Sequence, residues 1–326
     1  MLAKGQPKLI ALDALLNASS RNPSSDSLLA KAMSKVPNFI LATRLEGYDE
    51  KRQIFTEELL PAPVFRTVAQ LSYANIISEG EDNLITCRSF APFSALHNSQ
   101  NQVLLKESIT SKIASIAWPK AYEKLKERNK TAELINFTNS EQSWFVIDVE
   151  QALSGQFNIS LKDKVILMGY LGGYIGSPSW EDKFYTPLNP IYAGKASPDM
   201  FGLVIHANCL KMIKEANYLN QMPQWLAIIL STLLLMLILR VFWKVQFHYG
   251  HLYDIITKLS QLFLAIIIVY LMVIIFHLTG YKIDILLLLT GILLSSDALE
   301  IYLGLLKLRQ SAIRRFFKKN KVSTSS

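Results

Sequence analysis

The spacing of apolar residues changes near Pro223. Before it the apolar runs are short, and after it long apolar runs cover residues 225–243, 259–278 and 283–306. A helix needs about 20 residues to cross a hydrocarbon core of about 30 Å. Each run is about that long, and helices of soluble proteins seldom stay so apolar over such a length. The pattern therefore predicts three transmembrane helices.

Residues 1–222 alternate between short apolar runs and stretches of helical periodicity. Strands are predicted over residues 8–16, 38–43, 72–77, 84–89, 133–137, 143–147 and 164–169. Helices are predicted over residues 26–33, 63–69, 102–116, 119–129, 148–155 and 198–217. The runs at 72–77 and 84–89 are expected to form a hairpin, and the charged residues 44–60 a surface loop. Apolar strands alternating with helices indicate an α/β domain around a mixed sheet.

Composition and charge narrow the class of protein. Half of the residues are apolar and 18% are charged, which excludes a disordered chain and a purely soluble one. Residues 1–222 carry 23 Lys and Arg against 22 Asp and Glu, a net charge of +1. Residues 223–326 carry 11 against 4, a net charge of +7. A nearly neutral large domain does not favour nucleic acid as a partner.

The positions of the basic residues predict an orientation in the membrane. Seven bases lie within residues 307–321, and the loop after the first apolar run also contains bases, whereas the loop between the second and third runs has only Lys282. Basic loops stay on the cytoplasmic side. The sequence thus predicts a cytoplasmic tail over residues 307–326 and an outer location for residues 1–222.

The outer location raises a question about the start of the chain. Residues 1–10 contain neither a signal peptide nor a spanning helix. We expect that a membrane helix and one strand–helix unit precede Met1 in a longer chain. The alternative is that another protein supplies the first membrane helix.

Three motifs occur between residues 164 and 217. A strand, Val165–Gly169, ends in glycine; Asp182 precedes the Thr-Pro-Leu sequence of residues 186–188; and Gly202 precedes the Ile-His-Ala-Asn sequence of residues 205–208. Together they resemble the type-two cyclase/histidine-kinase-associated sensory extracellular (CHASE) domain. Residues 8–16 resemble, more loosely, that family's early strand ending in an aspartate, here Asp13.

The resemblance implies a bacterial sensor with an extracytoplasmic mixed-sheet α/β domain and three membrane helices, located in the cytoplasmic membrane. Many members of the family continue into a cyclase or kinase, whereas this chain ends about twenty residues after its last apolar run. The resemblance therefore implies that a stimulus is relayed to a separate partner protein. The expected partners are the lipid bilayer, a small ligand and a signalling or membrane protein, with a homodimer as a further option.

The motifs supply candidate ligand-binding residues. Gly169 and Tyr170 follow a strand, where ligands bind in open α/β sheets, and more glycines follow at positions 172, 173 and 176. Further candidates with polar side chains are Asp182, Thr186, His206 and Asn208. Structural alternatives stay open at this point: a loop that needs positive φ, an Asx-type turn before Pro187, and capping of the last helix by His206 and Asn208.

The sequence favours neither a metal site nor catalysis. His206 and Cys209 share a helical face, but two ligands do not make a zinc site. The chain has no Gly-x-Ser-x-Gly, His-Glu-x-x-His or Walker sequence, so we predict no enzyme and no cofactor. Cys87 and Cys209 are the only cysteines and are expected to be buried thiols.

Asp297 and Glu300 lie inside the third apolar run, three residues apart and so on one helical face. A carboxylate in the bilayer costs about 2.5–3.5 kcal/mol or more, so both are expected to face protein or water. One hypothesis is a polar contact with a partner, with Arg240 contributing; a static clamp between helices is another. An alternative function is an accessory subunit of a transport or assembly complex that uses this pair for ion coupling.

Overall fold

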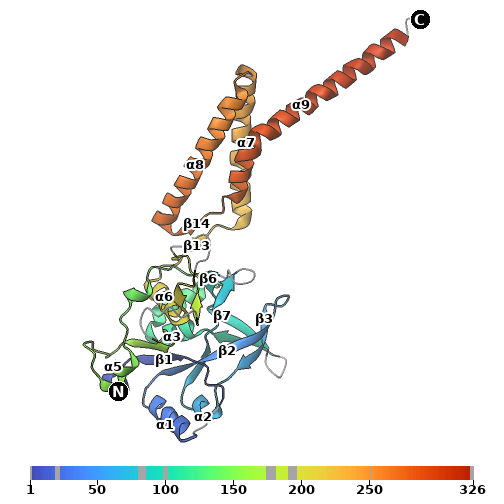
Figure 1. The fold of residues 1–326 in the computed structure, drawn as a ribbon. Helices are drawn as coiled ribbons and strands as arrows, with labels where there is room; N and C mark the ends of the chain where they lie inside the picture. The colour runs from blue at the N-terminus through green and yellow to red at the C-terminus, as the bar shows by residue number, and fades with distance from the viewer. Residues whose placement is uncertain are drawn as a thin grey trace. The chain divides into compact units, whose positions relative to one another are not determined.

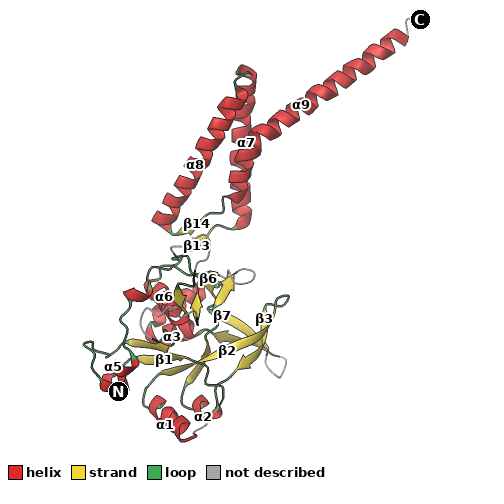
Figure 2. Cartoon of the chain, viewed as in Figure 1, coloured by secondary structure: helices red, strands yellow, loops and turns green. Residues whose placement is uncertain are grey.

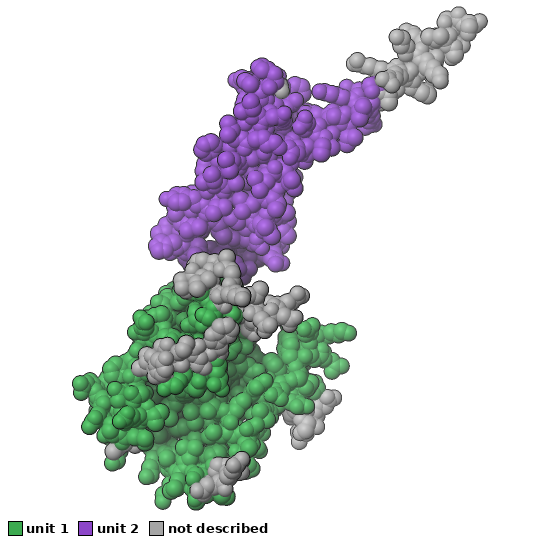
Figure 3. Space-filling view, in the orientation of Figure 1, with its two compact units in different colours: residues 1–218 green, residues 219–326 purple. Residues whose placement is uncertain are grey.

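The chain divides into two compact units, residues 1–218 and 219–326, which Figure 3 distinguishes by colour. The computed structural model describes residues 2–18, 23–79, 86–97, 102–173, 181–189, 197–249 and 251–323, with side chains up to residue 311.

Four parallel strands form the centre of unit 1. In spatial order they are β10 (Val165–Gly169), β1 (Leu9–Asp13), β2 (Phe39–Asp49) and β4 (Gln70–Tyr73). The register pairs Leu9 with Val165 and Asp13 with Gly169, so β1 and β10 end side by side. Short runs of apolar residues produce these strands, because both faces of a parallel sheet are covered by helices.

Helices cover both faces of this sheet, as Figure 1 shows. The helices are α1 (Pro23–Met33) and α2 (Pro63–Arg66) on one face, and α3 (Ile109–Ala117) and α6 (Gly202–Glu215) on the other. Successive strand residues point to opposite faces. Leu9 and Ala11 accordingly pack with α3 and α6, whereas Ile10 packs with α1 and α2. The predicted α/β domain around a mixed sheet is confirmed.

The predicted surface loop over residues 44–60 is wrong. Strand β2 continues to Asp49 and pairs antiparallel with β3 (Ile54–Leu59). The sheet then extends through β7 (Phe93–His97) to β8 (Val103–Glu107). Most side chains of this ribbon stay accessible to solvent, so its charged residues hid the strand pattern; Leu45, which is 2% exposed, is an exception.

Two further predictions need correction. The helix expected over residues 102–116 is strand β8 followed by α3, because Ser108 caps the helix by accepting a hydrogen bond from the Ser111 backbone N–H at 3.2 Å. Residues 143–147 form no strand. They follow a short 3-10 helix, η2 (Glu141–Ser143), in irregular backbone.

The remaining elements of unit 1 match the predictions in part: the helix expected over residues 198–217 begins only at Gly202, and the short elements at residues 2–5, 183–184 and 200–201 were not predicted. The remaining elements are η1 (Leu2–Gly5), β5 (Ile77–Glu79), β6 (Thr86–Phe90), α4 (Pro119–Arg128), β9 (Glu133–Leu134), α5 (Val149–Ser154), β11 (Lys183–Phe184) and β12 (Met200–Phe201). Strands β5 and β6 pair antiparallel, but the first strand of this pair is Ile77–Glu79 and not the predicted residues 72–77, of which the first two belong to β4; the turn lies outside the described residues. Helix α5 begins with a capping box between Asp148 and Gln151.

Unit 2 consists mainly of three long helices, coloured red in Figure 2. They are α7 (Gln224–His248), α8 (Tyr253–Thr279) and α9 (Leu286–Ser323), and the short strands β13 (Asn220–Gln221) and β14 (Tyr281–Lys282) pair beside them. Each helix contains a stretch long and apolar enough to cross a membrane, which confirms the prediction. Close packing of α7 and α9 requires Gly291, since a Cβ there would lie 2.4 Å from a methyl carbon of Leu235.

Candidate functional site

The candidate site lies at the carboxyl ends of β1 and β10. The chain leaves β1 toward α1, on one face of the sheet, and leaves β10 toward α6, on the other face. Open α/β proteins typically bind ligands in a crevice outside the carboxyl ends of two such strands. Asp13 ends β1, and Gly169 ends β10 directly opposite. The topology therefore places a carboxylate and a residue without a side chain at this crevice.

His206 comes to the same place from α6. Its Nε2 lies 3.7 Å from Oδ2 of Asp13, and the residue is only 6% exposed. The ring makes a hydrogen bond with the backbone of Ala74, just after β4, whereas Nε2 is buried without a hydrogen-bond partner. The bond to Ala74 therefore uses Nδ1. Because a carbonyl can only accept, this bond places a proton on Nδ1.

The protonation state of His206 determines whether its Nε2 can donate or accept a hydrogen bond. Burial lowers the pKa of His206, and this effect outweighs the opposing attraction of Asp13. The ring is therefore neutral at pH 7, with its proton on Nδ1. Its Nε2 is then a hydrogen-bond acceptor, and it faces the carboxylate of Asp13, which is also an acceptor. The two groups therefore do not form a hydrogen bond with each other.

Asp182 adds a second carboxylate at the start of α6. Its backbone carbonyl accepts a hydrogen bond from the Gly202 N–H at 3.0 Å, and its φ of 56° is in the left-handed region. A Cβ at Gly202 would lie 3.4 Å from Oδ1 of Asp182, so this glycine permits the close approach. Partial burial, with the nearby negative charges of Asp13 and Glu181, raises the pKa of Asp182 to about 6.

Tyr170 lies beside these groups, directly after β10. Its ring packs edge-on against Phe201 with 5.9 Å between ring centroids, and its hydroxyl donates to Glu181 at 3.3 Å. The tyrosine is 39% exposed. Its position next to Gly169 thus lets it contact a ligand from the solvent side.

Two other sequence candidates have structural partners. Thr186 donates from its hydroxyl to Oδ2 of Asp199 at 2.5 Å, and its backbone N–H donates to Oδ1 at 2.7 Å. Its hydroxyl also accepts from the N–H of Leu188 at 3.2 Å. The Thr-Pro-Leu sequence therefore fixes a loop against Asp199.

Asn208 holds residues 138–139 against α6. Its side-chain oxygen accepts from the N–H groups of Thr138 and Asn139, and its amide donates to the carbonyls of Asn139 and Val204. Residue 208 is 1% exposed. Since His206 and Asn208 lie within α6 rather than at its start, neither caps the helix as one alternative proposed.

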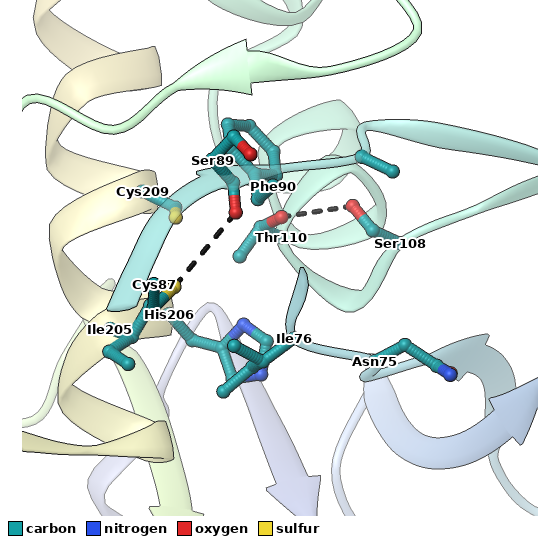
Figure 4. A pocket seen from close by; sticks show the side chains of 11 residues that line it. Asn75, Ile76, Cys87, Ser89, Phe90, Ser108, Thr110, Ile205, His206 and Cys209 are labelled. Atoms are coloured by element: carbon teal, nitrogen blue, oxygen red, sulfur yellow. Dashed lines mark hydrogen bonds between the residues drawn. The ribbon is translucent and has the colours of Figure 1, made fainter. Parts of the chain in front are cut away.

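A small cavity lies behind His206 (Figure 4). It measures about 10 Å³ and is lined by α6, β6, residues 75–76 and the start of α3. Such a volume is on the scale of a single water molecule. Cys87 and Cys209 both line it and are both 0% exposed, which confirms that the two cysteines are buried. Burial and the neighbouring Cys87 raise the pKa of Cys209, which makes it a poor nucleophile.

The described residues contain no group of three or more His, Cys, Asp or Glu side chains suited to hold a metal ion.

Of the glycines expected in the loop after β10, Gly172 has a φ of 83°, as a loop with positive φ requires, while residue 176 lies outside the described residues. The sequence marked Asp13 only as the end of a strand and not as a residue of the site. Its signal was a carboxylate directly after the apolar run of a strand.

Unit 2 contains a separate polar cluster. Lys258 of α8 forms an ion pair with Asp297 of α9, while Glu300 and Arg240 remain exposed. Next to this pair the buried Gln261 donates to the Ile292 carbonyl at 2.8 Å. The polar groups therefore join α8 to α9.

Comparison with known proteins assigns the family. The model of the CHASE2 domain matches residues 1–241, which include all of unit 1 and part of α7. The chain belongs to the CHASE2 family. CHASE2 is a sensory domain, and with three candidate membrane helices the chain fits a membrane-anchored sensor. Searches of curated proteins and of solved structures gave no match.

Proposed function

We propose that the protein is a sensor of the bacterial cytoplasmic membrane. Unit 1 lies in the periplasm, binds a small ligand at the crevice between β1 and β10, and does not catalyse a reaction. The three helices anchor unit 1, and the basic tail is cytoplasmic. The main support is the match to the CHASE2 domain over residues 1–241 in a chain with three candidate membrane helices.

The ligand-binding role is supported by the side chains at the crevice. Asp13, Asp182 and His206 are acceptors with solvent access through the two carboxylates, and Gly169 lies directly opposite Asp13. A hydrolytic role would need an activated nucleophile near the imidazole. The thiol of Cys209, one turn away on α6, has a raised pKa and is fully buried, so it is not activated.

The relay uses the continuity of the chain. His206 lies on α6, which ends at Glu215, and α7 begins at Gln224. A ligand that draws His206 toward Asp13 displaces α6, and residues 216–223 carry this displacement into the first membrane helix. Small helix shifts are a common means of switching, because packed helices have discrete arrangements. The output then belongs to a separate signalling protein that contacts the helices or the tail.

Cysteine labelling in intact cells tests the orientation. Lys120→Cys places a thiol on an exposed position of α4, and Ser326→Cys places one at the end of the basic tail. We expect a membrane-impermeant maleimide to label the first variant in intact cells and the second only after permeabilisation. Background is low, since both native cysteines are buried. Labelling of Ser326→Cys but not Lys120→Cys in intact cells would overturn the proposal.

A further inference from the structure

We propose that Asp13, Asp182 and His206 bind a small primary ammonium ion, an inference that rests on the sensory function proposed above and names the ligand class of its site. It starts from the 3.7 Å separation between His206 Nε2 and Asp13 Oδ2. His206 is more than nine-tenths buried, and its Nε2 has no hydrogen-bond partner. Buried polar atoms are nearly always paired, and an exception calls for an explanation such as an absent ligand.

The acceptors determine which ligand fits. A neutral imidazole with its proton on Nδ1 and two carboxylates offer lone pairs only. A primary ammonium group carries three N–H donors and one positive charge, so it can donate to both Asp13 and His206, whose acceptor atoms lie 3.7 Å apart, while the nearby carboxylate of Asp182 attracts its charge. Anionic ligands meet two negative charges there and are disfavoured.

The surroundings of the carboxylates also favour a cationic ligand. Among the residues that the structure describes, neither Asp13 nor Asp182 forms an ion pair with Lys or Arg. Asp182 is partly buried and lies near Asp13, so the two negative charges destabilise each other. A bound cation would relieve this repulsion. A metal ion is the less suitable cation, because the described residues provide no group of three ligands placed to hold one.

Gly169 and Gly202 shape the walls of the site. A Cβ at Gly169 would lie 3.4 Å from Cβ of Asp13, and a Cβ at Gly202 would lie 3.4 Å from Oδ1 of Asp182. Both glycines therefore adjoin a carboxylate that the ligand needs. A Cβ would also lie 3.0 Å from Leu203 at Gly169 and 3.0 Å from Ile76 at Gly202, so a larger residue at either position would press on the side chains around the carboxylates.

Binding of ethylammonium to the purified full-length chain tests the proposal, by saturation-transfer NMR in detergent at neutral pH. Tetraethylammonium is the matched cation without N–H donors. We expect saturable binding of ethylammonium, and a loss of about tenfold in affinity for Asp13→Asn and for Asp182→Asn, because each removes a negative charge that attracts the cation. The control Glu127→Gln removes an exposed carboxylate from α4 and should leave binding unchanged.

Several outcomes would overturn the proposal. They are no saturable binding, equal binding of tetraethylammonium, an affinity unchanged from that of the native chain in both aspartate variants, or displacement of ethylammonium by micromolar zinc or calcium, which would assign a metal site instead. Asp182 is accessible and its variant keeps the polar group, so this variant tests the site even where Asp13→Asn fails to fold. Cysteine labelling reports the orientation independently: binding without the expected orientation would refute the sensory function alone, and the reverse would refute the ligand class alone.

Discussion

His206 Nε2 and Asp13 Oδ2 lie 3.7 Å apart, although both are hydrogen-bond acceptors when the neutral histidine carries its proton on Nδ1. The two residues are far apart in the sequence, and the fold brings them together by placing the end of β1 beside α6. A structural contact would have been completed by a donor, as Asn208 completes its own contacts nearby. Binding of a donor at this place would supply the partner that Nε2 of His206 lacks.

The replacement Asp182→Asn should stabilise unit 1 at neutral pH. Folding raises the pKa of Asp182 from 3.8 to about 6, so the folded state disfavours the ionised form. The protonated carboxyl of Asp182 therefore contributes stability that is complete below pH 3.8 and is lost as the pH rises through about 6 and the carboxyl ionises. Asparagine removes this loss, and it tolerates the left-handed φ of 56°. After allowance for solvent screening we expect a rise of about 1–2 °C in melting temperature at neutral pH.

Thermal melting of both proteins across the acidic range checks this prediction. The advantage of the variant should be complete above about pH 6 and should disappear near pH 3.8, where the native carboxyl is protonated as well. Asp163→Asn, at an exposed position that also has a positive φ, serves as the matched control. A gain that stays constant over this pH range would contradict the electrostatic explanation.

Gly169→Ala should weaken ligand binding more than it weakens the fold. The added Cβ would lie 3.0 Å from a methyl carbon of Leu203, whose flexible end can move, and 3.4 Å from Asp13. We expect a loss of about 1 kcal/mol in the free energy of unfolding and several-fold weaker ethylammonium binding. Gly173→Ala is the control, since a Cβ at Gly173 would have no neighbour within 4 Å. Equal effects of the two variants on NMR-detected binding would argue against a site at the strand ends.

Asn208→Ala should destabilise unit 1 strongly. The change removes four hydrogen bonds from a buried amide and leaves the N–H groups of Thr138 and Asn139 without this acceptor. A loss of about 2–3 kcal/mol follows, measured as the free energy of unfolding in urea. Asn136→Ala removes one exposed hydrogen bond to Asn217 and should cost about 0.5 kcal/mol or less. Similar values for the two variants would show that Asn208 does not hold this segment.

The sequence predicted those parts of the fold where one physical effect dominates. Long apolar runs identify α7, α8 and α9, and fully apolar strands identify β1 and β10. The ribbon of β2 and β3 was missed because its two strands are largely solvent-accessible, so charges replace the alternation that marks a half-buried strand. Strand β8 was missed since its residues continue directly into the cap of α3.

The candidate site was accessible to sequence reasoning only in part. Strand ends and motif residues pointed to Gly169, Asp182 and His206, which the fold brings together with Asp13. Thr186 had the same polar character, yet its partner is Asp199, thirteen residues later in the chain. Whether a polar side chain faces a ligand or another part of the fold depends on tertiary contacts, and a single sequence does not contain them.

Replacements of Lys258 and Asp297, which form an ion pair, should have non-additive effects on stability. Both residues lie on candidate membrane helices, where a charge without a partner is unfavourable. Lys258→Leu or Asp297→Leu alone leaves one charge unpaired and should lower the melting temperature of the chain in lipid nanodiscs. The double variant removes both charges and should recover most of the loss, as a double-mutant cycle would measure.

Glu300→Gln provides the control for this cycle. Glu300 is exposed on the same helix, and no ion pair of it occurs among the described residues, so its replacement should change the melting temperature little. Additive losses in the double variant would mean that Lys258 and Asp297 act independently. Strong coupling would instead identify the pair as a static link between α8 and α9. Such a link leaves Asp297 occupied, which is unfavourable for the ion-coupling role of the transport alternative, and directs the search for a partner toward the exposed Glu300 and Arg240.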